Sequence, residues 1–137
     1  MLFIILGGCV VANVNLNKIF NLYEEVALSN TLKSFISPNE KVCFVVKTVR
    51  DMAVFTDKRI LVADKQGSAG KKVEYYTIPF KNIITYAVET AGTFDLDPEI
   101  KLILASGITI ELKFMKGKNT DQLLLKAYYL INNFIIG

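Results

Sequence analysis

The feature that most constrains the fold is a succession of short runs rich in β-branched and aromatic residues between Lys41 and Met115. Residues that favour turns separate these runs, and this combination is typical of β-strands joined by hairpins. The expected strands cover about residues 41–49, 52–56, 59–65, 72–79, 83–91, 98–105 and 108–115, with boundaries good to a few residues. The pattern therefore predicts a mainly β fold, a seven-stranded antiparallel barrel or sandwich.

The last of these runs alternates most cleanly. One face would carry Ile108, Ile110, Leu112 and Phe114, and the other Thr109, Glu111 and Lys113. Since successive side chains of a strand point to opposite faces, one face is expected in the core and the other in solvent. Ser106-Gly107 supplies the preceding turn, because glycine tolerates the positive φ that tight hairpin turns require.

A helix is expected at the C-terminal end, from Asn119 to Ile136. It opens with polar residues, Asn119-Thr120-Asp121, which can cap free N–H groups and suit the positive end of the helix dipole. Its apolar positions are Leu123, Leu124, Ala127, Tyr128, Leu130, Ile131, Phe134 and Ile135. This arc is broader than one barrel end requires, so the helix is either deeply seated in the core or also part of a subunit contact.

A second helix is predicted before the strands, from Lys18 to Ile36. Ile19, Leu22, Tyr23 and Val26 form one apolar stripe at helical spacing. Ser37-Pro38-Asn39 would end this helix, because proline lacks a backbone donor and disfavours helix in the residue before it. This organisation predicts an N-terminal segment and helix over residues 1–38 and the β domain over residues 39–137.

The chain has 137 residues, enough for one compact core. Hydrophobic residues make up 52% of it and charged residues 21%, which leaves more apolar side chains than a core of this size absorbs. Self-association is therefore expected. The net charge of +3 is too small to make nucleic acid a required partner.

The residue types that are missing argue against catalysis. The sequence contains no histidine, which removes the commonest general base and transition-metal ligand. Cys9 and Cys43 stand far apart and form no C-x-x-C pair, so neither a zinc site nor a disulfide framework is expected. We expect no catalytic residue, cofactor or metal ion, and a reducing compartment fits best.

The N-terminal residues 1–12 are apolar, but they are too few to span a bilayer. Leu6-Gly7-Gly8-Cys9 is similar to a bacterial lipoprotein cleavage box, although the basic residues that precede such a signal are absent. We expect a segment that packs on its own domain or on a neighbouring subunit, and a cytoplasmic protein. The alternative is membrane association through this apolar end.

Several stretches of the β region resemble the bacterial pleckstrin-homology-like family. They are Val49-Arg50-Asp51-Met52-Ala53-Val54-Phe55-Thr56-Asp57-Lys58-Arg59-Ile60-Leu61, Asp64-Lys65-Gln66-Gly67, Gly70-Lys71-Lys72-Val73-Glu74-Tyr75 and Val88-Glu89-Thr90-Ala91-Gly92-Thr93-Phe94-Asp95-Leu96-Asp97. The resemblance runs from about Glu40 to the C-terminus. It implies a seven-stranded barrel capped by a C-terminal helix, no known catalytic activity, and cyclic homo-oligomers of about five subunits.

The resemblance also implies a hydrophilic surface between neighbouring protomers that binds an unidentified protein partner. The matching motifs and the hairpin chemistry place the predicted protein-interaction surface on Asp64, Lys65, Lys71, Lys72, Glu89, Thr93 and Asp95. The alternative is a module that binds phospholipid headgroups at a membrane surface. The residues expected for that role are Lys47, Arg50, Lys58 and Arg59, although Asp51 and Asp57 lie among them.

Two further motifs fail on their spacing. Residues 67–71 are glycine-rich, but they lack the four-residue gap, the Ser or Thr after the lysine and the helix of a phosphate-binding loop. Asp95, Asp97 and Glu99 alternate like the start of a calcium loop, but Ile100 stands where that loop needs glycine. Asp97-Pro98 is better explained as a turn between strands.

Overall fold

The computed structural model describes residues 4–6, 9–11, 17–66, 72–90, 97–117 and 119–137. Its strands are β1 (Ile4–Leu6), β2 (Cys9–Val11), β3 (Asn17–Glu25), β4 (Val42–Thr48), β5 (Met52–Thr56), β6 (Arg59–Gln66), β7 (Lys72–Pro79), β8 (Ile83–Glu89), β9 (Glu99–Leu104) and β10 (Thr109–Phe114). Its helices are α1 (Asn30–Lys33), α2 (Thr120–Ile135) and the short 3₁₀ helix η1 (Phe80–Asn82). The seven predicted strands and the C-terminal helix are confirmed.

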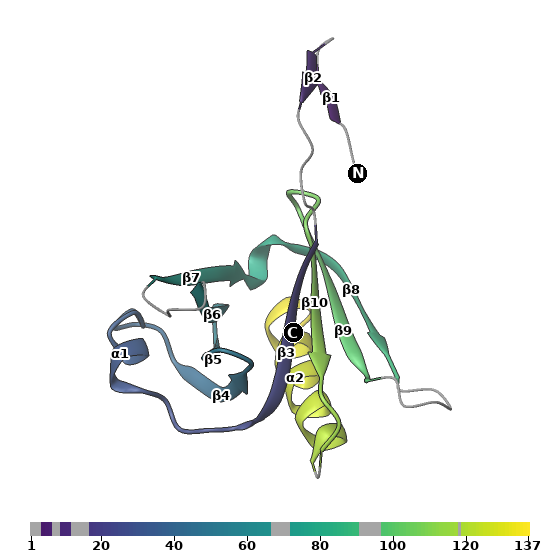
Figure 1. The fold of residues 1–137 in the computed structure, drawn as a ribbon. Coiled ribbons are helices and arrows are strands. Elements are labelled where there is room, and N and C mark those ends of the chain that lie inside the picture. The colour runs from purple at the N-terminus through teal and green to yellow at the C-terminus, as the bar shows by residue number, and fades with distance from the viewer. Residues whose placement is uncertain (1–3, 7–8, 12–16, 67–71, 91–96, 118) are drawn as a thin grey trace.

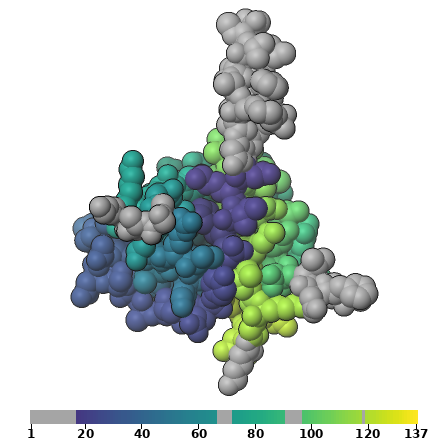
Figure 2. Space-filling view, in the orientation of Figure 1, coloured from purple at the N-terminus to yellow at the C-terminus, as the bar shows by residue number. Residues whose placement is uncertain are grey.

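Eight strands form one curled sheet in the order β7-β6-β5-β4-β3-β10-β9-β8 (Figure 1). Neighbouring strands are antiparallel except for β3 and β10, which run parallel. In the space-filling view, β3 crosses the visible face between the half built from β4–β7 and the half built from β8–β10 and α2 (Figure 2). β1 and β2 form a separate two-stranded ladder.

The expected helix from Lys18 to Ile36 is wrong. Its first half is strand β3, and only the four-residue helix α1 forms in its second half. Lys18, Phe20 and Leu22 turn to the inside of the sheet at a spacing of two, while Ile19 is exposed. Strands β4 and β10 flank β3, and these tertiary hydrogen bonds override the helical spacing of the apolar residues.

The core lies between the concave face of the sheet and α2. The helix buries Leu123, Leu124, Ala127 and Ile131, while Tyr128, Leu130, Phe134 and Ile135 pack partly against the same cluster. The alternation expected near the C-terminal end of the sheet is confirmed, because Ile110, Leu112 and Phe114 are fully buried. Gly107, with φ +90°, forms the turn between β9 and β10 as expected.

A second, smaller apolar cluster covers the outer face of β4, β5 and β6. It consists of Leu32, Val45, Val54, Leu61 and Ala63. Ser29 caps α1 by accepting a hydrogen bond of 3.2 Å from the backbone N–H of Leu32. Because the segment around α1 packs on this outer face, β5 and β6 are buried on both sides.

Candidate functional site

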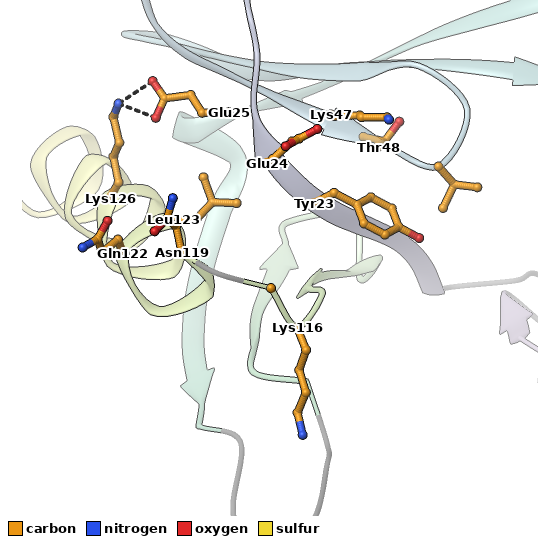
Figure 3. Close-up of a pocket in the computed structure, with 12 residues that line it drawn as sticks. Tyr23, Glu24, Glu25, Lys47, Thr48, Lys116, Asn119, Gln122, Leu123 and Lys126 are labelled. Atoms are coloured by element: carbon orange, nitrogen blue, oxygen red, sulfur yellow. Dashed lines mark hydrogen bonds and ion pairs between the residues drawn. The ribbon is translucent and has the colours of Figure 1, made fainter.

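A groove with a volume of about 610 Å³ opens where β3, the end of β4 and the start of α2 meet (Figure 3). It is lined by Tyr23, Glu24, Glu25, Lys47, Thr48, Val49, Lys116, Gly117, Asn119, Gln122, Leu123 and Lys126. β3 and β4 pair irregularly here, with a register shift between Leu22 and Glu25. This irregularity separates the two strands beside the helix and gives the groove its place in the fold.

An ion pair fixes one wall of the groove. Lys126 on α2 lies 2.8 Å from a carboxylate oxygen of Glu25 on β3, as Figure 3 shows. The same ammonium group stands 5.1 Å from the centre of the Phe44 ring, a cation–π distance. Lys126 thus ties α2 to the edge of the core, so the helix cannot shift along β3 without breaking both contacts.

The remaining lining combines apolar and charged groups. The side chains of Tyr23 and Val49 are exposed, with Lys47 and Glu24 beside them. The hydroxyl of Thr48 already accepts a hydrogen bond of 3.1 Å from the backbone N–H of Asp51. Exposed apolar groups bordered by charges suit recognition of another molecule by contact, which is the pattern of protein interfaces.

The four residues expected to bind a headgroup do not come together. Lys47 lines the groove, and Arg50, in the β4–β5 turn, donates a hydrogen bond of 2.9 Å to the carbonyl of Lys65. Lys58 and Arg59 lie at the other end of β5, which has five residues. A strand of that length separates its ends by roughly 16 Å.

Arg59 is held inside the protein by a network of hydrogen bonds. Its guanidinium forms an ion pair of 2.8 Å with Glu40 and donates hydrogen bonds to the carbonyl of Phe35 and the hydroxyl of Thr77. The side chain of Glu40 is only 2% exposed. The hydrogen bond from Arg59 lowers the pKa of Glu40 to about 2, helped by a hydrogen bond from Thr56 and opposed by burial.

The predicted protein-interaction surface divides between two places. Asp64, Lys65 and Lys72 lie at the end of the β6–β7 hairpin, where Asp64 accepts a hydrogen bond from Gln66. Glu89 ends β8, at the opposite edge of the sheet. Lys71, Thr93 and Asp95 lie outside the described residues.

Glu89 belongs to a small network of charges on the outer face of β8 and β9. It pairs with Lys101 at 2.9 Å, and Glu99 lies 3.6 Å from the same ammonium group. The hydrogen bond from Lys101 lowers the pKa of Glu89, and Glu89 in turn raises the pKa of Lys101. Burial raises the pKa of Glu99, and a hydrogen bond with Glu89 raises it further.

The described residues contain no group of three or more His, Cys, Asp or Glu side chains that could hold a metal ion. Asp97, considered above for a calcium loop, instead accepts a hydrogen bond of 3.0 Å from the backbone N–H of Lys116. This contact ties the start of β9 to the segment that follows β10.

Sequence reasoning named only Lys47 among the residues that line the groove. The others come from three segments that lie far apart in the sequence, around residues 23–25, 47–49 and 116–126. The predicted helix at residues 18–36 would also have removed Tyr23 and Glu24 from any sheet. The exposed Val49 beside a lysine was the one local signal that could have drawn attention to this place.

A mainly β sheet curled around a C-terminal helix is the arrangement of PH-like domains. The family model "Bacterial PH domain" matches residues 12–129, so the chain belongs to the bacterial PH domain family. The predicted resemblance is confirmed. The matched region begins upstream of residue 39 and includes β3, which pairs within the main sheet.

Two proteins of Bacillus subtilis strain 168 are similar in sequence. The chain is 50% identical over 76 residues to the uncharacterized protein YjqA, over 56% of this chain and 61% of that protein. The match therefore spans less than two thirds of that relative. The chain is also 31% identical over 91 residues to the uncharacterized protein YozO, over 66% of this chain and 78% of that protein.

Solved structures of bacterial PH proteins share the fold. A DUF1696 family protein with a pleckstrin-homology domain from Shewanella loihica PV-4 aligns with a TM-score of 0.72 and 37% identity, over 84% of this chain and 97% of that one. A pleckstrin homology domain from Shewanella amazonensis SB2B aligns with a TM-score of 0.62 and 37% identity, over 78% and 84%. PH domains are in general non-catalytic.

Proposed function

We propose that this chain is a non-catalytic PH-like module that assembles with copies of itself into a closed ring and binds another protein through the groove between β3 and α2. The observation that carries the assembly is the apolar surface left on α2. Leu125, Tyr129 and Ile136 are exposed, and their spacing of four and seven residues puts them on one helix face. A helix that is apolar on its solvent side as well as its core side is typical of one that is buried in an assembly.

The groove supports the partner-binding part of the proposal. Its exposed Tyr23 and Val49 offer apolar anchors, and Lys47 and Glu24 offer charges of both signs around them. Protein interfaces combine a central apolar contact with a polar rim, and tyrosine is enriched among the residues that dominate binding. The rigid strands and the Lys126–Glu25 ion pair hold this lining in place.

Headgroup binding has less support. Arg59 already uses its guanidinium for Glu40, Phe35 and Thr77, and Lys58 lies at the end of β5 away from Lys47 and Arg50. The four cations therefore offer no single pocket for a phosphate group. Among the described residues, no helix is long and apolar enough to cross a membrane.

Substitution of an exposed groove residue tests the partner site. Val49→Asp places a charge among the apolar anchors, and we expect it to abolish capture of a specific partner from host lysate by the tagged protein. Ile19→Asp is the matched control, because Ile19 is also exposed but lies on the outer face of β3, outside the groove. Capture that is equal for the unaltered protein and Val49→Asp would reject the groove as the partner site.

A further inference from the structure

Both ends of the eight-stranded sheet are free strands. Within the described residues, β7 is hydrogen-bonded to β6 alone and β8 to β9 alone. Each therefore presents a row of backbone N–H and C=O groups on its outer side. Such an edge is a template for pairing with a strand of another chain, unless charges, proline or a covering segment prevent it.

β8 carries little of this protection. From Ile83 to Val88 it contains no charged residue, no proline and no glycine, and its residues favour strands. Ile84 is 67% exposed. An apolar edge strand of seven residues left open in this way would promote aggregation of a monomer, so it is expected to be covered in the working form of the protein.

The apolar stripe of α2 adjoins this edge. Tyr86 on β8 donates a hydrogen bond of 2.6 Å from its hydroxyl to the side chain of Asn132, and its ring meets Tyr128 edge-on at 6.2 Å. Tyr129 follows Tyr128 along the helix and is exposed. A strand added to β8 would therefore find backbone groups to pair with and an apolar helix face beside them.

The two free edges also carry complementary charges at their ends. Lys72 begins β7 and Glu89 ends β8, and both are exposed. Within one chain they lie at opposite edges of the sheet and form no ion pair. If β7 of one copy lay antiparallel to β8 of another, the first residue of β7 would meet the last residue of β8.

We propose that β8 of each copy pairs with β7 of the next copy in antiparallel orientation, which names the subunit contact of the ring and rests on the proposed self-assembly. The strands have seven and eight residues, so their lengths match. The contact joins two different surfaces, and repetition of such a contact produces a closed ring when the rotation allows it. It removes both free edges and brings the two separated parts of the predicted interaction surface, Asp64, Lys65 and Lys72 on one copy and Glu89 on the next, to one subunit boundary.

A second copy fits the edge better than another occupant. A bilayer offers no backbone groups to pair with a strand, and this chain supplies a free strand of matching length and opposite terminal charge. Antiparallel pairing of β8 with itself around a two-fold axis would leave β7 uncovered and would stop at two subunits. The experiment below separates that arrangement from the proposed one.

The first arm of the test blocks the edge. Ile84→Lys puts a charge on β8 at a side chain that is already exposed, so the fold of the monomer should be preserved. We expect the subunit dissociation constant, measured by light scattering over a dilution series, to rise about tenfold or more. Ile19→Lys is the control, because Ile19 is 52% exposed on β3, an interior strand, and should leave assembly unchanged.

The second arm exchanges the charges. Lys72→Glu and Glu89→Lys should each weaken assembly by juxtaposing like charges, and the double variant should restore it, with circular dichroism recorded on every variant. A monomeric unaltered protein would refute self-assembly itself. An unaltered oligomer that persists in Ile84→Lys, Lys72→Glu and Glu89→Lys would refute the edge contact alone. A two-subunit particle, or a double variant no better than the single ones, would refute β7 as the partner strand.

Discussion

Arg59 shows how a residue that suggests a binding role from the sequence can have a structural one. Its guanidinium, 19% exposed, satisfies the buried carboxylate of Glu40 and two further acceptors from separate parts of the chain. The sequence places Arg59 in a hairpin beside other charges, which is typical of a solvated turn. Its acceptors could not be foreseen, because Phe35, Glu40 and Thr77 reach it only through the tertiary fold.

Removal of this arginine should therefore be costly for stability. Arg59→Met leaves the Glu40 carboxylate buried without its partner, and we expect the free energy of unfolding to fall by about 3 kcal/mol. Lys58→Met changes a neighbouring exposed cation and should alter it by no more than about 0.5 kcal/mol. Urea titrations followed by circular dichroism measure both. Equal, small effects of the two substitutions would contradict the structural role of Arg59.

The same network predicts a pH dependence. The pKa of Glu40 is about 2 in the folded protein, below its usual value of 4.5, so its contribution to stability is present above pH 4.5 and is lost as the pH falls through 2. The shift corresponds to a loss of at most about 3 kcal/mol. Glu40→Gln should flatten the stability profile between pH 4.5 and 2 relative to the unaltered protein. Parallel profiles for the two proteins would contradict the low pKa.

At the level of elements, regular alternation predicts strands well and short apolar segments less well. The seven strands of the β region follow from β-branched runs between turns, and α2 follows from a long helical periodicity with a polar start. β3 fails because Ile19, Leu22 and Tyr23 satisfy helical spacing, while its strand spacing of Lys18, Phe20 and Leu22 begins with a charged residue. Its neighbours β4 and β10 decide the outcome, and they come later in the sequence.

Two substitutions distinguish a strand from a helix at this place. A helix would bury Ile19 and Leu22 together on one stripe, whereas strand β3 buries Leu22 fully and exposes Ile19. We expect Leu22→Ala to lower the free energy of unfolding by about 3 kcal/mol, as for other buried leucines. Ile19→Ala should lower it by about 1 kcal/mol or less. Thermal and urea unfolding provide the comparison, and equal losses would favour the helix.

At the level of the whole molecule, β3 links the fold to its proposed function. It joins the two halves of the sheet, and its irregular pairing with β4 opens the groove beside α2. The apolar composition led us to expect self-association from the sequence, but the location of that surplus could not be predicted. The structure places exposed apolar residues on the solvent face of α2 and on the free edge strand β8.

The mass of the purified chain in solution tests the central proposal most directly. Multi-angle light scattering on the intact chain, at tens of micromolar and in moderate salt, gives this mass independently of shape. A closed ring predicts one sharp species at a whole-number multiple of 15.3 kDa, above two subunits, that neither grows into larger species nor changes in subunit number as concentration rises. A single species at 15.3 kDa across the same concentrations would contradict the assembly.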